Sequence, residues 1–465
     1  MRVPLTPSAD AGPPWAPYSP GPEQPWNRRR IVHLHRSVGF AATREEIERD
    51  LQEGPEASVD RFLQGQGPIG LDSDFERIAA RLGDAAVDSR DPERLKAWWV
   101  FRMLASPDPL GERLTLAWHN HFATSNRKVD DLGAMRRQND LFRRHARAPF
   151  GDLVNAAVRD PALLIWLDAP ANRKGHPNEN LARELLELFT LGIGHFHETD
   201  VKEAARALTG WTLLEGAFVE NQLVHDAGEK TILGKSGPWR GADLVSILLD
   251  HPATAQRLAG RLSDLFIGED ILGPEDVNEL ANGLRTHHLN IEWGAATVLR
   301  SRAFFSSRNL GSRVVDPVGF VLGAVRALQM FAPPPRTLRL ASWITQVGQD
   351  LFYPANVGGW PGGRSWLSSR ALIARANFAT TLMAGREFGL HEPPDILRAT
   401  GQDIDQTASL DRVIETLTEL LLGYDPGPAW RKPIAATAGE GSGSIAESAR
   451  RAVALILSSP EAQVA

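Results

Sequence analysis

Helix start signals recur along this chain, whereas strand signals are confined to one short stretch. Thr43 with Glu46 three residues later has the spacing of a capping box, in which side chains satisfy free backbone N–H groups at a helix start. Asp108 before Pro109 predicts another start, since proline fits the first helical turn. Strand-like alternation occurs near 217–233, where Ala217–Glu220 and Gln222–Val224 predict a hairpin, with Thr231–Leu233 nearby. We therefore expect a mainly α, compact, multi-helix globular fold with a small β-hairpin element.

Composition narrows the classes of protein that fit. The 465 residues are 42% hydrophobic, enough for a large core, and no apolar run reaches the length of a membrane span. The formal net charge of -6 gives no basic surplus, so nucleic acid is not an expected partner. The absence of cysteine excludes disulfides, thiolate metal sites and cysteine nucleophiles.

The positions where proline and glycine interrupt regular structure predict the domain organisation. We expect a flexible Pro/Gly-rich tail over 1–30, a helical domain over 31–424 with the β element near 217–233, a linker or loop over 425–444, and a C-terminal helix and tail over 445–465. The segment Met1–Trp26 lacks the continuous apolar stretch of a secretory signal. A cytoplasmic location is therefore the default expectation.

Several long motifs occur in order along nearly the whole chain. They include Trp118–Ser125, Asn178–Phe189, Glu203–Trp211 and Gly358–Gly363. With these motifs the chain resembles a bacterial family called domain of unknown function 1800. The resemblance implies no particular activity. Similar proteins are often exported through a twin-arginine leader, which this sequence does not show, and often sit beside genes for sulfatase-like proteins, so the resemblance implies export and a sulfatase-like partner.

The predicted helix from Pro109 to Phe122 carries two histidines. At about 100° per residue, His119 and His121 point about 200° apart, so they cannot chelate one metal while both are helical. They share a side only if the chain becomes extended after Trp118. His121 falls on the apolar face. In the structural interpretation, His121 is a core histidine that donates to a backbone carbonyl. In the functional interpretation, it is a metal ligand or an acid/base group.

The predicted helix from Asn178 to Leu191 carries two carboxylates beside its apolar face. Glu184 and Glu187 in a polar pocket would suit metal binding or general acid/base catalysis. The same residues also fit a salt-bridged surface helix, in which Arg183 pairs with Glu179 or Glu187. The helix has no histidine, which argues against the Glu-x-x-His pattern of di-iron bundles.

Other candidates lie in turns and loops. His225 and Asp226 follow the strand-like stretch, where they could ligate a metal or simply cap a turn. Asn172 lies in a polar loop, and we expect it to contact substrate together with Asn180 and Arg183.

Three neighbouring helices, 110–122, 131–146 and 178–191, each bring polar groups to a buried edge, where such groups must satisfy one another or line a site. The leading hypothesis is an enzyme with a metal-assisted hydrolytic site between helices, for which zinc or iron would suit imidazole and carboxylate ligands. The rival hypothesis is a non-catalytic binding or assembly protein whose buried polar motifs are structural. The predicted catalytic residues are Glu184, Glu187 and His121, and the predicted metal ligands are His119, His121, His225 and Asp226.

Overall fold

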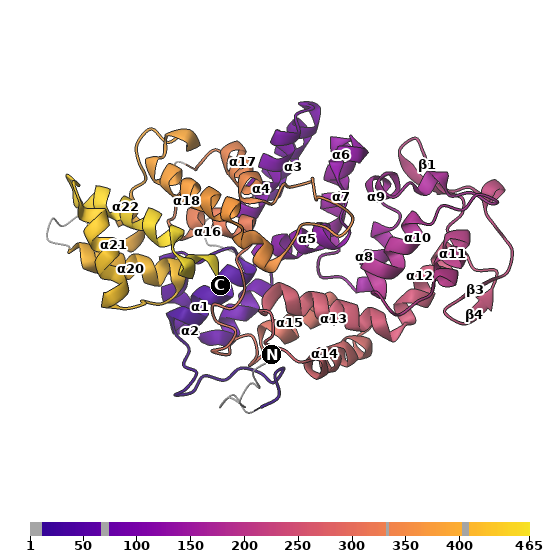
Figure 1. Cartoon of the computed structure of the whole chain (residues 1–465), viewed down its shortest axis with the longest axis horizontal. Helices are drawn as coiled ribbons and strands as arrows, with labels where there is room; N and C mark the ends of the chain where they lie inside the picture. The colour runs from indigo at the N-terminus through magenta and orange to yellow at the C-terminus, as the bar shows by residue number, and fades with distance from the viewer. Residues whose placement is uncertain (1–11, 67–73, 332–333, 402–408) are drawn as a thin grey trace.

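The computed structural model describes residues 12–66, 74–331, 334–401 and 409–465. Helices dominate this part of the chain, and two small antiparallel sheets of two strands each complete it (Figure 1). The predicted mainly α fold is therefore confirmed. No helix among the described residues is long and apolar enough to cross a membrane.

The first half of the chain begins with five helices of 11 to 20 residues, and shorter helices are frequent after them. Asp108 caps α5 as predicted, because its Oδ1 accepts a hydrogen bond from the Gly111 N–H at 2.9 Å, with Pro109 in the first turn. The predicted capping box of Thr43 and Glu46 also forms, at the start of α2. The elements are α1 (Arg28–Val38), α2 (Arg44–Leu63), α3 (Phe75–Asp88), α4 (Pro92–Ala105), α5 (Pro109–His121), α6 (Asn126–Val129), α7 (Leu132–Arg144), α8 (Phe150–Ala157), α9 (Pro161–Trp166), η1 (Ala169–Ala171), α10 (Asn180–Glu184), the π-helix η2 (Leu185–Thr190) and α11 (Glu198–Ala207).

The β element differs from the predicted hairpin in its pairing. Gln222–Val224, which the alternation marked as a strand, is a short 3₁₀ helix, and Ala217–Glu220 pairs instead with the preceding strand Trp211–Leu214. The strands and the helices that follow them are β1 (Trp211–Leu214), β2 (Ala217–Glu220), η3 (Gln222–Val224), β3 (Lys230–Ile232), β4 (Lys235–Gly237), α12 (Gly241–Asp250), α13 (Pro252–Phe266), α14 (Pro274–Thr286) and α15 (Ile291–Leu299).

The C-terminal part contains a helix where the sequence predicted a linker over 425–444. Within that range α21 packs between α20 and α22, and burial of Trp430 and Ile434 against the core outweighs the helix-breaking tendency of Pro433. The elements are α16 (Pro317–Ala327), α17 (Thr337–Val347), η4 (Gly363–Leu367), α18 (Ser369–Ala384), η5 (Arg386–Phe388), α19 (Ile396–Thr400), α20 (Leu410–Leu422), α21 (Pro428–Gly439), α22 (Ile445–Ser458) and η6 (Pro460–Gln463).

The segment predicted as a flexible tail over 1–30 makes specific contacts where it is described. The Trp15 Nε1–H donates to the Asp276 carbonyl at 2.7 Å, and the buried Tyr18 donates to the Gln24 carbonyl at 2.8 Å. Aromatic rings give this Pro/Gly-rich stretch apolar area to bury, and this anchors it. Residues 1–11 of the predicted tail lie outside the described residues.

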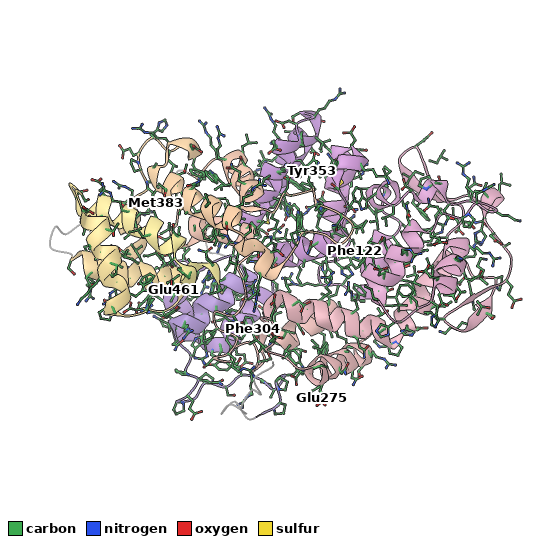
Figure 2. The ribbon with its side chains drawn as sticks, in the orientation of Figure 1. Phe122, Glu275, Phe304, Tyr353, Met383 and Glu461 are labelled. Atoms are coloured by element: carbon green, nitrogen blue, oxygen red, sulfur yellow. The ribbon has the colours of Figure 1, made fainter. Side chains whose placement is uncertain are left out.

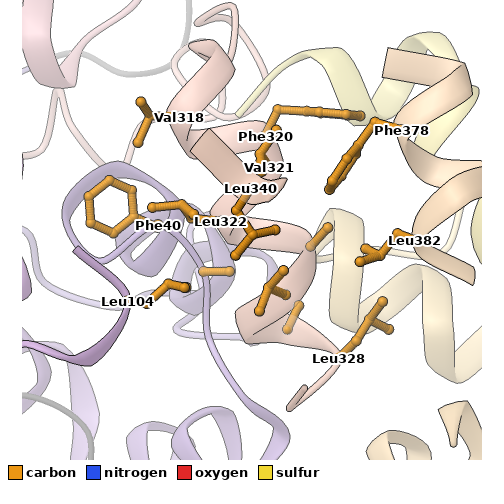
Figure 3. Close-up of a cluster of buried hydrophobic side chains, with 14 of the residues drawn as sticks. Phe40, Leu104, Val318, Phe320, Val321, Leu322, Leu328, Leu340, Phe378 and Leu382 are labelled. Carbon is orange, nitrogen blue, oxygen red and sulfur yellow. The ribbon is translucent and has the colours of Figure 1, made fainter. Parts of the chain in front are cut away.

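Two hydrophobic cores form the interior. The first joins α4 to the C-terminal helices α16–α22, and Figure 3 shows part of it, with Phe40 and Leu104 facing side chains of α16, α17 and α18. The second joins α7–α15. α5 contributes to both, with Leu116 in the first core and Leu114 and Trp118 in the second. It lies in the middle of the molecule in Figure 1.

Candidate functional site

The position of α5 between two cores determines where its two histidines point. His119 faces aromatic rings that come from both cores, and its imidazole is fully buried. The surrounding rings lie with centroids 5.1–5.9 Å away and belong to Trp99, Phe142, Phe352 and Trp360. Figure 2 places Phe122, the residue after α5, near the centre of the molecule.

His119 makes no hydrogen bond through either ring nitrogen within the described structure. Burial alone lowers its pKa to about 3, so the ring is neutral at physiological pH. The ring is packed as a flat apolar group, stacked on Trp360 at an interplanar angle of 19°. α5 remains helical through His121, so the extended geometry that chelation by His119 and His121 requires does not occur.

His121 points to the other side of α5, toward the π-helix η2. Its Nε2 lies 3.0 Å from the Phe189 carbonyl, one of the carbonyl groups left without a partner at the end of η2. Because a carbonyl only accepts, Nε2 carries the hydrogen. The contact predicted by the structural interpretation of His121 is therefore present, and burial with the nearby charges of Arg261 and Arg257 holds the pKa of this imidazole well below its usual value.

The predicted carboxylates Glu184 and Glu187 stand at the junction of α10 and η2, and both are half-buried. Burial raises the pKa of Glu184, and the neighbouring charge of Glu187 adds to the effect. The structure thus brings these two carboxylates near each other, as the helical spacing predicts. Neither of them lines the cleft described below.

His225 and Asp226 each have a structural partner. His225 is buried with its Nδ1 2.9 Å from the Thr209 carbonyl. Asp226 forms an ion pair with Arg206, with 2.8 Å between Oδ2 and Nε, and its Oδ1 accepts the Gly228 N–H at 2.9 Å. The guanidinium of Arg206 lowers the pKa of Asp226 to about 2. This is the turn-capping alternative that the sequence left open.

The predicted substrate contacts Asn172, Asn180 and Arg183 are engaged within the protein. The buried amide of Asn172 donates to the Ala205 carbonyl at 2.8 Å and accepts from the backbone of the loop that it closes. Asn180 donates to Asp168 at 3.2 Å. Arg183 pairs with Glu198 at 2.8 Å and with the predicted partner Glu179 at 3.0 Å.

The predicted metal ligands do not converge. Within the ranges that the structure describes, no group of three or more His, Asp or Glu side chains is arranged to hold a metal ion. His119, His121, His225 and Asp226 have the separate surroundings given above, so this donor set does not fit a single ion. No reaction step is derived through a metal.

A cleft with a volume of about 690 Å³ opens beside His121. This size falls in the range of small-molecule sites. Its walls come from the second half of α5, the end of α13, the segments 267–270 and 312–316, and the loop 358–366. Of the residues predicted from the sequence as catalytic, substrate-binding or metal-ligating, His121 is the one that lines this cleft.

The glycine-rich loop 358–363 is fixed against the end of α5. The Trp360 N–H donates to Oδ1 of Asn120 at 2.6 Å, and the Trp360 indole N–H donates to the Asp350 carbonyl at 3.0 Å. Gly359 has a φ of 92°, and a side chain there would meet the Asn120 carbonyl at 2.6 Å. The glycine therefore permits the close approach that brings Trp360 and its neighbours to the cleft.

Four arginines from separate elements lie at one end of the cleft, two in its wall and two behind it. Arg113 is buried and pairs with Asp316 at 2.6 Å, while Arg36, Arg313 and Arg375 form no ion pair in the part of the chain that the structure describes. Burial lowers the pKa of each of these three to about 10, and nearby guanidinium groups contribute at Arg36 and Arg313. All remain charged at neutral pH, and among the described residues Asp316 is the carboxylate that forms an ion pair with this group, through Arg113.

A second cationic wall comes from α13. Arg261 is half-buried, forms no hydrogen bond or ion pair within the described structure, and has its Nε enclosed. Asp264, three residues later, has its pKa raised by burial even though Arg261 and Arg257 oppose the shift. Apolar and aromatic side chains of the lining include Leu262, Leu265, Trp360 and Trp366.

The lining also contains charged side chains beyond α13. Asp270 is one of them, and Glu269 forms an ion pair with Arg364 at 3.8 Å.

The arginines of the cleft could not be predicted from the sequence. Arg113, Arg313 and Asp316 come together across some 200 residues of chain, and no local pattern signals that contact. One signal was present: Arg257 and Arg261 are four residues apart, and each is followed directly by an apolar residue, Leu258 and Leu262, which places like charges on one side of a helix next to the core.

A family model described as "Protein of unknown function (DUF1800)" matches residues 33–464 of this chain. No curated protein and no solved structure matches it.

Proposed function

The chain belongs to the DUF1800 family, whose description states no activity. From the structure of the cleft, we propose that this protein binds a small organic anion between α5, α13 and the loop 358–366. The observation that carries the proposal is the excess of positive charge around Asp316, where Arg113 and Arg313 line the wall and Arg36 and Arg375 lie behind them. The other carboxylates of the lining, Asp264, Glu269 and Asp270, come from the end of α13 and the segment after it, and the charges that act on Arg313 are those of Arg113 and Asp316. Buried charge without a counter-charge is expensive, and an anion in the cleft would offset that cost.

The rest of the lining supports an organic ligand over a simple inorganic ion. Leu262, Leu265 and the rings of Trp360 and Trp366 offer apolar surface next to the guanidinium groups. The cleft thus combines apolar surface with charged groups that can fix the orientation of a ligand, as small-molecule sites do. This corresponds to the binding-protein alternative of the sequence analysis.

Calorimetric titration with acetate, at an ionic strength held constant with sodium chloride, tests the proposal. We expect acetate to bind and to raise the melting temperature by mass action. Arg313→Gln should weaken acetate binding at least tenfold. The control is Arg300→Gln, which removes an exposed arginine paired with Asp60 and absent from the cleft lining. Absence of acetate binding, or equal binding by both variants, would contradict the proposal.

Hydrolysis in the same cleft is a second candidate function. It is favoured by Asp264, because a carboxyl group with a raised pKa on a cleft wall suits general acid catalysis. The metal-assisted form predicted from the sequence lacks a donor set among the described residues. Turnover of p-nitrophenyl phosphate, reduced about 100-fold in Asp264→Asn, is the expected result; turnover unchanged in that variant would exclude this role.

We also propose export and a sulfatase-like partner, both of which the family resemblance implies. Fractionation of the native host and co-purification with the full-length chain would test them separately from ligand binding.

A further inference from the structure

The hydrogen-bonding state of His121 is fixed by the geometry around it. Its Nε2 must carry a hydrogen, because it lies 3.0 Å from the Phe189 carbonyl, which can only accept. The ring is neutral, since burial and the charges of Arg261 and Arg257 disfavour a second proton. In this tautomer the other nitrogen, Nδ1, carries a lone pair and acts as an acceptor.

Nδ1 of His121 has no hydrogen-bond partner among the described residues, although it is buried. A buried acceptor without a donor costs free energy, and native structures seldom leave one unmatched. The side chain lines the cleft, so a bound molecule is the natural source of that donor. The nearby Arg261 also has an enclosed Nε–H without an acceptor.

The two unmatched groups have opposite requirements. Arg261 has the charge of Asp264 nearby but no hydrogen-bond acceptor among the described residues, and Nδ1 of His121 needs a donor. Arg257 cannot be the acceptor, because a guanidinium only donates, and its Nε and Nη2 already donate to the Leu188 carbonyl at 3.3 and 3.2 Å. A ligand that meets both requirements carries an anionic group with a donor close to it. Arg261 and Arg257 are the charges that lower the pKa of His121, and Asp264 is not among them, so an ammonium donor at Nδ1 would be repelled, which leaves a neutral donor.

We infer that the anion bound in this cleft is hydroxylated, with its charged group at Arg261 and its hydroxyl donating to Nδ1 of His121, as in a 2-hydroxy carboxylate. This inference rests on the proposed anion-binding function and names the chemical class of the ligand. His121 is thereby a specificity-determining residue that acts as a neutral hydrogen-bond acceptor.

Comparison of glycolate with acetate, which differ by one hydroxyl, tests the inference on the full chain. We expect glycolate to bind about three- to tenfold more tightly, the range given by one net hydrogen bond. Arg261→Met should weaken both ligands. If acetate does not bind, the proposed function itself fails. If acetate binds and glycolate binds no better, this inference is overturned and the proposed function stands.

Nitrogen-15 NMR of the histidine rings gives a readout that needs no variant at the site. The lone-pair nitrogen of His121 should move on addition of glycolate and stay in place with acetate. His119 is the internal control, because it is also neutral, buried and unpartnered but does not line the cleft. Tighter glycolate binding without movement of the His121 nitrogen would overturn the role given to this residue.

Discussion

Asp160 caps α9 from a buried position. Its Oδ1 accepts the Leu163 N–H at 3.1 Å and the Gln138 amide at 2.7 Å. Burial outweighs these hydrogen bonds and raises the pKa of the carboxyl group to about 6, compared with about 3.9 in an unfolded chain. Between these two values the folded state binds more protons than the unfolded state. Stability therefore falls as pH rises from about 4 to about 6, and does not recover above that window.

Asp160→Asn should remove this loss of stability at higher pH. The asparagine Oδ1 can accept the same two hydrogen bonds, and the amide carries no charge to desolvate. We expect the free energy of unfolding at pH 7 to rise by about 1–2 kcal/mol and its decline between pH 4 and 6 to flatten, as measured by urea denaturation. Asp131→Asn is the control, because Asp131 caps α7 in an exposed position. Identical pH profiles for the two variants would argue against the role of Asp160.

At the same scale, the sequence could predict contacts that depend on one helix. It predicted that His121 and His119 point apart, which follows from a rotation of 100° per residue. Donation by His121 to a carbonyl was one of its two interpretations of this residue, and it follows from the apolar face. The surroundings of His119 could not be predicted. Its neighbours Trp99, Phe352 and Trp360 are brought to it from three other segments by tertiary packing.

At the scale of elements, η2 depends on neighbouring elements. The Leu188 and Phe189 carbonyls at its end are satisfied by Arg257 of α13 and His121 of α5. A π-turn has i→i+5 hydrogen bonds, as between the Leu191 N–H and the Leu186 carbonyl at 2.9 Å, and is rare on its own. The sequence predicted one regular helix here, because only packing against α13 and α5 favours the wider turn.

Arg257→Met should therefore destabilise the protein, whereas Arg261→Met should mainly affect ligand binding. Both residues lie on α13 one turn apart, so each variant controls for the other. We expect Arg257→Met to lower the free energy of unfolding by about 1–2 kcal/mol through the loss of the Leu188 contacts. Arg261→Met should change it by less than about 0.5 kcal/mol. Chemical denaturation without added anions measures both, and the reverse order would refute this account of η2.

Helices and strands could be predicted where a local sequence signal determines them. They could not be predicted where the element depends on which distant segment it pairs with. The Asp108–Pro109 start of α5 was predictable because the cap and the proline act within one turn. The partner of Ala217–Glu220 was not, because short polar strands specify register weakly. The cleft was missed for the same reason, since its walls combine α5, α13 and the loop 358–366 from distant parts of the chain.

At the scale of the whole molecule, the cleft lies where the two hydrophobic cores meet. Trp118 of α5 and Leu262 of α13 belong to the second core, and Leu116 and Trp360 belong to the first, yet all four line the cleft. An anion bound there contacts elements of both cores, so ligand binding should stabilise them together.

Shared use of α5 should also make the two cores unfold together. Phe378 is fully buried in the first core against Phe320 and Trp343, and Phe150 is fully buried in the second core against Trp118. Removing either ring leaves a cavity, so Phe378→Ala and Phe150→Ala should each cost about 3–5 kcal/mol. Because α5 cannot keep its place when one of its faces loses its core, each variant should shift one common transition.

Urea unfolding followed by tryptophan fluorescence and by far-UV circular dichroism measures this coupling. We expect coincident curves for the wild-type chain and for both variants, displaced to lower urea. Leu223→Ala is the control, because this side chain is 92% exposed and its loss should change stability by less than about 0.5 kcal/mol. A biphasic curve in which Phe150→Ala moves one phase and Phe378→Ala the other would mean that the cores unfold independently, and that α5 links them in space without linking their stability.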